Sequence, residues 1–222
     1  MTTTKTRILK AVGLLAASLT LCISGFAQGP EIVYNNTTTS LGQQYTSDLE
    51  FGDQVTLDGA NRLLSQFQFE YFASLTPAAS KQGLLRIYQN NGTGGAPNTL
   101  VFESNPFTLN NSFNQVIITG ITGVTLPSTF TWTVAFAGLT GSEAGGLLLY
   151  NPPSFGSSAD DFWQKNAFGV WGLQRLPGSG STANFGAKIT AVPEPGTVQI
   201  AMLGGFCYLG FLLFRRHSQK VA

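Results

Sequence analysis

Alternation of apolar and polar residues is the dominant pattern between positions 31 and 189. In residues 129–137, four large apolar side chains fall on one face: Phe130, Trp132, Val134 and Phe136. Residues 62–73 alternate in the same way, with aromatic and aliphatic side chains on one face and Gln or Glu on the other. Successive side chains of a strand point to opposite faces, so this period predicts strands with one buried and one solvent-facing side.

Shorter apolar runs predict further strands at residues 54–57, 84–89, 99–104, 114–121, 146–150, 168–174 and 184–191. Clusters of Gly, Asn, Pro and Ser separate them, as expected of turns. Amphipathic helical windows do not interrupt the series. The pattern therefore predicts an all-β fold, an antiparallel β-sandwich, and secreted modules of this size favour a jelly-roll arrangement.

The N-terminal residues 1–27 have the order of a secretory signal peptide. Lys5, Arg7 and Lys10 precede an apolar run at residues 11–23, and small residues follow as far as Ala27. This order predicts export by the general secretion machinery and cleavage after Ala27. The alternative is an uncleaved membrane anchor, although the run is short for a membrane span.

The C-terminal segment, residues 192–222, combines several signals. The motif Pro193-Glu194-Pro195 comes first, and its two prolines block continuation of a helix or sheet. Residues 198–214 form an uncharged apolar run near the lower limit of a transmembrane helix. Arg215 and Arg216 open a basic tail at residues 215–222, and the positive-inside rule keeps them in the cytoplasm. Residues 28–191, the expected ectodomain, are then on the outer side of the membrane.

This combination resembles the sorting signal of the PEP-CTERM family, the exosortase-dependent surface proteins of Gram-negative bacteria. The resemblance covers the signal peptide and about the last thirty residues, from the Pro193-Glu194-Pro195 motif onward. It implies that exosortase, a membrane transpeptidase, acts near the motif and that the inner-membrane precursor passes to the cell surface or exterior. It also implies an association with exopolysaccharide and biofilm. An ordinary C-terminal membrane anchor is the alternative.

Charge and cysteine content exclude several function classes. Residues 28–194 carry 6 basic and 11 acidic side chains, hence a net charge of −5, whereas nucleic-acid binders need a basic surface. Both cysteines, Cys22 and Cys207, lie in the hydrophobic ends. The ectodomain therefore has no disulfide, thiol chemistry or cysteine zinc site of its own.

Catalysis by a Ser-His-Asp or Cys-His group is also excluded, because the single histidine, His217, lies beyond the expected transmembrane helix. Carboxylates remain. Glu50 and Asp53 flank a Phe-Gly pair and are a weak candidate for a structural calcium site, with ordinary solvated loop acids as the alternative. No other cofactor is expected.

A carbohydrate site is the other candidate. Residues 150–166, expected to be a loop, combine aromatic and polar side chains, and sugars stack on exposed aromatic rings. The candidate residues are Tyr150, Asp160, Asp161 and Trp163. Alternatively, Trp163 and its aromatic neighbours cover one end of the sandwich. Trp132 and Trp171 are assigned to the core.

These observations lead to a non-enzymatic exported protein, a structural or adhesive component of the cell surface or extracellular matrix. The second hypothesis is a lectin-like carbohydrate-binding module. A carboxylate-dependent glycosidase is the third, and it needs two facing acids in a cleft.

Overall fold

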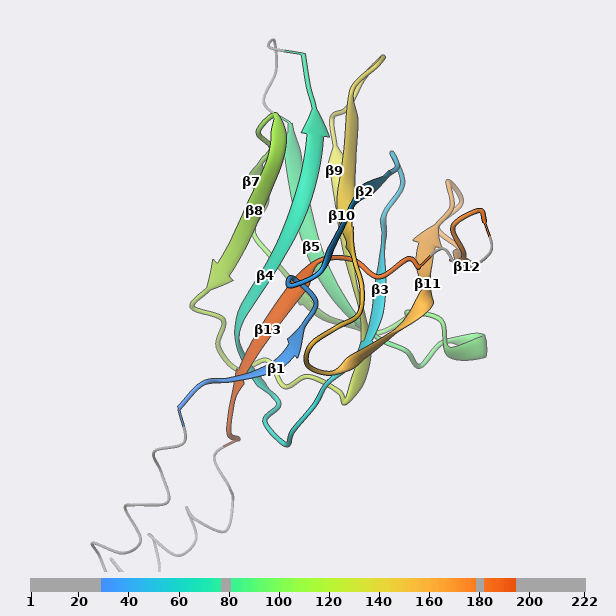
Figure 1. Ribbon diagram of the computed structural model, residues 1–222. Coiled ribbons are helices and arrows are strands. Elements are labelled where there is room, and N and C mark those ends of the chain that lie inside the picture. Colours follow the sequence, from blue (N-terminus) through green and yellow to red (C-terminus); the bar gives the residue numbers. More distant parts are fainter. Residues whose placement is uncertain (1–28, 77–80, 179–181, 195–222) are drawn as a thin grey trace, which may run out of the picture.

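The computed structural model describes residues 29–76, 81–178 and 182–194, which form two antiparallel sheets packed face to face (Figure 1). Within these ranges the helical structure consists of one short 3-10 turn, η2 (Thr93–Gly95). The prediction of an all-β, sandwich-like fold is confirmed.

Sheet A is built around β4 (Leu63–Ser74). Residues 66–69 of β4 pair with both β8 (Ser112–Thr119) and β13 (Ala187–Val192), so those two strands flank β4 on opposite sides. β10 (Ala144–Tyr150) pairs with residues 71–74 of β4, on the same side of β4 as β13. Two outer strands complete the sheet: β1 (Glu31–Asn35) pairs with β13, and β2 (Ser40–Thr46) pairs with β10.

Sheet B has the order β12 (Trp171–Gln174), β11 (Ser157–Lys165), β3 (Phe51–Thr56), β9 (Thr129–Ala137), β5 (Gln82–Gln89) and β6 (Leu100–Glu103). The short strand β7 (Phe107–Thr108) pairs with the start of β5. From β8 to β11 each successive strand belongs to the other sheet. The connections therefore cross repeatedly over the ends of the sandwich.

The core lies between the sheets and is rich in aromatic rings. Trp132 is fully buried, with its ring centroid 5.5 Å from that of Phe67 and 5.9 Å from that of Phe69. These residues stand on the inward faces predicted for residues 62–73 and 129–137, which confirms both strands and the core assignment of Trp132. Burial of each such side chain contributes about 1.5–3 kcal/mol to stability.

Four strands were not expected, and one of them is the two-residue β7. β1 and β2 are short edge strands, and every residue of β2 except Tyr45 is exposed, so β2 has no apolar alternation to detect. Residues 157–165, expected to be part of a loop, form β11 and pair with β3 on one side and β12 on the other. Their polar sequence is held in extended form by these two partners.

Both ends of the described chain leave the sandwich at one pole. β1 and β13 are antiparallel neighbours, with Glu31 opposite Ala191 (Figure 1, bottom). Pro193 and Glu194 follow β13 without regular structure, and Glu194 is exposed. The expected signal peptide with Ala27, Pro195, the helix at 198–214, Arg215 and Arg216 lie outside the described residues. Within the described ranges, no helix has the length and apolar character needed to cross a membrane.

Candidate functional site

The two rings expected to form a sugar-stacking platform lie on opposite sides of the sandwich. Trp163 stands opposite Gly52 on the outer face of sheet B and is 7% exposed. Tyr150 ends β10, is 8% exposed, and donates its hydroxyl hydrogen to Glu70 at 2.5 Å on the outer face of sheet A. Burial, together with the Glu70 carboxylate, raises the pKa of Tyr150 to about 12. The prediction of a shared platform is therefore wrong, because the residues belong to different sheets.

Asp160 and Asp161 also lie differently from expectation. Both are in β11, at an irregularity in its pairing with β3 between Ser158 and Phe162. Asp160 is exposed, and the Asp161 carboxylate lies 3.7 Å from the guanidinium of Arg175. Such bulges bend a strand and redirect its side chains. The pair is therefore part of a strand rather than of a loop.

Glu50 and Asp53 cannot share a cation, because their side chains lie on opposite faces of sheet B. Asp53 is opposite the inward-facing Trp132 in the register and is fully buried. Glu50 bonds with Thr133 on the outer face. The residues described here contain no group of three His, Cys, Asp or Glu side chains that could hold a metal ion. The predicted calcium site is therefore wrong.

Asp53 instead belongs to a buried polar network between the sheets. Its Oδ1 lies 2.7 Å from the Ser158 hydroxyl, and its Oδ2 accepts the backbone N–H of Phe185 at 3.2 Å. The same hydroxyl lies 3.0 Å from Oδ1 of Asn184. One hydroxyl hydrogen can serve only one of these two oxygens. A proton on Asp53 resolves the conflict, since Asp53 then donates to Ser158 and Ser158 donates to Asn184. Burial raises the pKa of Asp53 well above its ordinary value, despite the hydrogen bonds it accepts.

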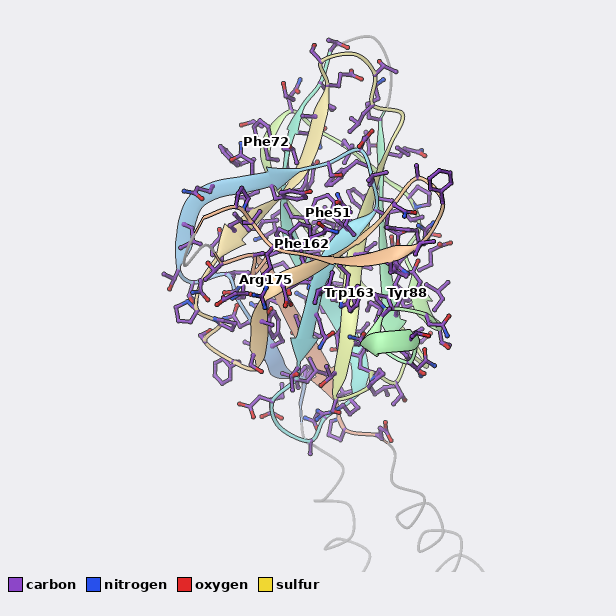
Figure 2. All side chains as sticks on the ribbon, turned by 90° about the vertical axis from the view of Figure 1, so that its right-hand side faces the viewer. Phe51, Phe72, Tyr88, Phe162, Trp163 and Arg175 are labelled. Carbon is purple, nitrogen blue, oxygen red and sulfur yellow. The ribbon has the colours of Figure 1, made fainter. Side chains whose placement is uncertain are left out.

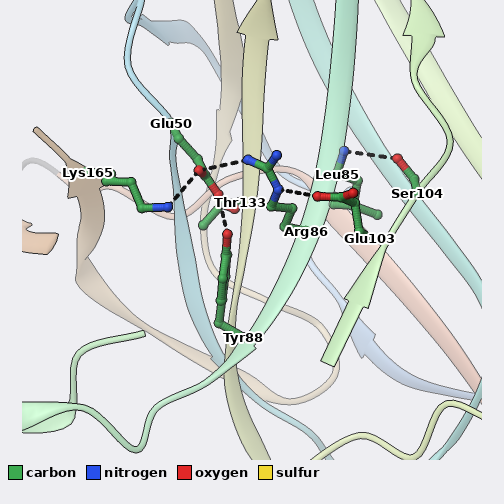
Figure 3. Close-up of polar contacts among 8 residues, drawn as sticks. All are labelled: Glu50, Leu85, Arg86, Tyr88, Glu103, Ser104, Thr133 and Lys165. Atoms are coloured by element: carbon green, nitrogen blue, oxygen red, sulfur yellow. Dashed lines mark hydrogen bonds and ion pairs between the residues drawn. The ribbon is translucent and has the colours of Figure 1, made fainter. Parts of the chain in front are cut away.

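The outer face of sheet B carries a network centred on Glu50 (Figure 3). Its carboxylate receives the guanidinium of Arg86 at 2.9 Å and the ammonium of Lys165 at 3.1 Å. The hydroxyls of Tyr88 and Thr133 donate to its other oxygen at 2.9 and 2.8 Å. The Glu50 carboxylate is thus bound by four donor groups, which come from three different strands: β5, β9 and β11.

The protonation of Glu50 follows from these contacts. Burial alone would raise the pKa of Glu50, but the hydrogen bond from Thr133 and the charges of Lys165 and Arg86 outweigh it and lower the pKa. Burial and the adjacent Glu50 carboxylate raise the pKa of Tyr88. The network is therefore a carboxylate between two cations with a neutral phenol beside it.

Aromatic rings adjoin this network. The Lys165 ammonium lies 4.7 Å from the ring centroid of Trp171, and the Trp171 and Tyr88 rings meet edge to face with centroids 5.5 Å apart. Trp163 donates its indole N–H to Gln54 at 3.2 Å; it and Tyr88 are labelled in Figure 2. Trp171 is half-buried on the outer face, so its assignment to the core is wrong.

The turn between β11 and β12 projects an apolar tip. Phe168 is 91% exposed, and Val170 and Leu173, which follow within five residues, are also exposed. The Asn166 side-chain oxygen accepts the backbone N–H groups of Phe168 and Val170, each at 3.0 Å. The side chain of Asn166 thus holds the turn that presents the Phe168 ring to solvent.

A hollow of about 570 Å³ lies beside β2, away from the Glu50 network. None of its lining residues has a titratable side chain: Leu41, Gln43, Gln44, Leu149, Asn151, Leu176, Pro177 and Thr182. It supplies no acid pair for the glycosidase alternative.

We call the set of Glu50, Arg86, Tyr88, Lys165 and Trp171 the sheet B cluster. Sequence reasoning named Glu50 for a different role and missed Arg86, Tyr88 and Lys165. Their alternation within strands was visible, but the strand order that unites them was not. Comparison with protein-family models, curated proteins and solved structures gives no match to this chain. The cluster pairs charges with aromatic edges, an arrangement suited to binding polar ligands.

Proposed function

We propose that this chain is a non-enzymatic exported surface protein whose β-sandwich is sorted through its C-terminal segment by exosortase and serves as a structural or adhesive component of exopolysaccharide or biofilm. The observation that carries the proposal is the pairing of Glu31 with Ala191. Both expected targeting segments are attached at one pole, so the two ends can face the membrane while the rest of the sandwich points outward.

The spacing of the motif adds a constraint. Val192, the last residue of β13, is opposite Leu63, and Pro193 follows at once. An extended residue spans about 3.3–3.6 Å. The processing enzyme would therefore act within about 10 Å of the folded sandwich, without a long spacer.

Replacement of Pro193, Glu194 and Pro195 by Ala tests this proposal in a host that has an exosortase. The expected result is retention of the full-length chain in the inner-membrane fraction, measured by fractionation and immunoblotting. Pro106→Ala, at an exposed loop position, is the matched control and should leave sorting unchanged. Normal release of the triple variant would contradict the proposal.

A second candidate function is carbohydrate recognition by the sheet B cluster. The half-buried Trp171 and the partly accessible Arg86 and Lys165 favour it, since they place an aromatic edge beside polar groups. A glycan array probed with the exported protein tests the idea. Trp171→Ala should weaken any glycan signal at least tenfold, whereas Phe113→Ala on sheet A should not. Equal signals from both variants would exclude the cluster as the binding site.

The jelly-roll connectivity also stays a proposal. It is supported by the repeated passage of the chain from one sheet to the other between β8 and β11.

A further inference from the structure

β8 is an unprotected edge strand. It pairs with β4 over eight consecutive residue pairs without a register shift, and the described residues supply no strand on its other side. Unpaired backbone N–H and C=O groups along such an edge are a template for another strand.

The other edges of the two sheets are interrupted or short. The pairings of β1, β2 and β6 each contain a register irregularity. β7 has two residues and β12 has four. These are devices that prevent strands from pairing between molecules. β8 lacks them, and its sequence, SFNQVIIT, contains neither a charged residue nor proline.

The exposed face of β8 carries large apolar side chains. Phe113 is 62% exposed and Ile117 is 51% exposed, with Gln115 between them on the same outer face. The alternate residues Val116 and Ile118 pack against the core. One face of the strand is thus fixed by the sandwich, and the other is apolar at both ends with an amide in the middle.

We propose that β8 is a self-association site, which pairs antiparallel with β8 of a second copy of this chain about a two-fold axis through Gln115. In this register Phe113 of each copy stands opposite Ile117 of the other, and the two Gln115 side chains face each other. Residues opposite one another in an antiparallel pair share a face, so the exposed apolar side chains cover each other. Aromatic and β-branched side chains are favourable cross-strand partners.

The sequence of β8 favours a second copy as the occupant. Residues 28–194 have a net charge of −5, which opposes contact between two copies over most of their surface. β8 is neutral along its whole length. It is also complementary to itself in the proposed register, as a two-fold interface requires.

The two-fold symmetry determines the relative orientation of the two molecules. A two-fold axis normal to the sheet reverses every direction within the sheet. Thr119, at the end of β8, and Thr190, near the end of β13, both pair with Gln66, so β8 runs toward the pole where the chain ends lie. In the dimer the two poles therefore point in opposite directions. Copies attached at their poles would bridge two facing surfaces rather than associate side by side on one.

Disulfide trapping tests the register. The full-length chain, with Cys22 and Cys207 replaced by Ala, is given Gln115→Cys and oxidised with diamide. Gln115→Cys should form a disulfide-linked dimer, because equivalent residues meet at the axis. Gln44→Cys on the exposed edge strand β2 is the matched control and should stay monomeric. A mixture of Phe113→Cys and Ile117→Cys chains should form far more disulfide-linked dimer than either variant forms alone.

A charge substitution tests the association without a crosslink. Ile117→Lys should abolish the dimer in sedimentation of the purified full chain at about 100 µM, whereas Leu173→Lys, at an equally exposed position on β12, should retain it. Circular dichroism of both variants checks the fold. A monomeric parent chain at this concentration, equal trapping of Gln115→Cys and Gln44→Cys, or a β8 edge that pairs only with a different protein would each overturn the proposal.

Discussion

The ammonium of Lys165 lies 4.7 Å from the ring centroid of Trp171, its cross-strand partner, and 3.1 Å from the Glu50 carboxylate. One cation thus joins the hairpin of β11 and β12 to the ion pair between Glu50 and Arg86. Cation–π contacts at partly exposed sites are worth about 0.5–1 kcal/mol, and hydrogen bonds to charged groups about 1.5–3 kcal/mol.

Lys165→Met should therefore lower the free energy of unfolding by about 1–2 kcal/mol, since Glu50 keeps Arg86 as a partner. Urea denaturation followed by tryptophan fluorescence measures the change. Lys188→Met on sheet A is the control and should change stability by less than about 0.5 kcal/mol. Equal effects of the two substitutions would show that the Lys165 contacts add nothing specific.

Asp53 should make the protein less stable as pH rises from acid toward neutral. Burial raises its pKa in the folded state, so above the ordinary carboxyl pKa of about 4 the unfolded chain releases a proton that the folded chain still holds. Stability should therefore fall, by up to about 1.4 kcal/mol per pH unit, until the raised pKa is passed.

Asp53→Asn isolates this contribution from that of Glu50, whose lowered pKa acts in the opposite direction. The amide can still accept from the Phe185 N–H and donate to Ser158. The difference in stability between parent and variant, measured by urea titration at pH 4, 5.5 and 7, should shift in favour of the variant as pH rises. A constant difference across this range would mean that Asp53 is ionised in the folded protein.

Removal of the Trp132 ring should destabilise the sandwich strongly. It is fully buried among Phe67, Phe69 and Phe185. Trp132→Ala should cost about 3–5 kcal/mol or abolish folding. Phe168→Ala removes a ring that is 91% exposed and should change thermal stability only slightly. A milder core change, Trp132→Phe, keeps the measurement possible if the alanine variant does not fold. Its loss of stability should lie between those of Trp132→Ala and Phe168→Ala.

Asn166 should control the order of the β11–β12 turn. Asn166→Ala removes the acceptor for two backbone N–H groups and should cost about 1 kcal/mol. Hydrogen exchange of the Phe168 and Val170 amides should accelerate, with exchange in β9 unchanged. Asn105→Ala, at an exposed loop position, should alter neither. Unchanged protection of the two amides in Asn166→Ala would contradict the role given to this side chain.

Local alternation was sufficient to predict β4 and β9, because alternate residues within one continuous segment form the apolar face of each strand. It misjudged their outer faces. Thr131 and Thr133 alternate with the apolar residues of β9 and so belong to the side predicted to face solvent, but they are fully buried, since Asn90 and Glu50 cover them and bond with their hydroxyls. Polarity alone does not reveal such cover.

The sheet B cluster was beyond sequence reasoning for a related reason. Glu50 is 36 residues from Arg86 and 115 from Lys165, and only the strand order of sheet B brings them together. The opposite error was made for Tyr150 and Trp163, which were predicted to lie together but do not. They are close in sequence, but the chain changes sheets between β10 and β11, so the rings face opposite sides.

The mass of the mature protein tests the export proposal most directly. Intact mass spectrometry and terminal peptide mapping of protein recovered from the cell surface and medium would define both ends of the chain. The proposal predicts a polypeptide that begins at Gln28 and ends close to Pro193-Glu194-Pro195, without residues 198–222. Recovery of the uncut 222-residue chain from the cytosol as the main form would contradict it.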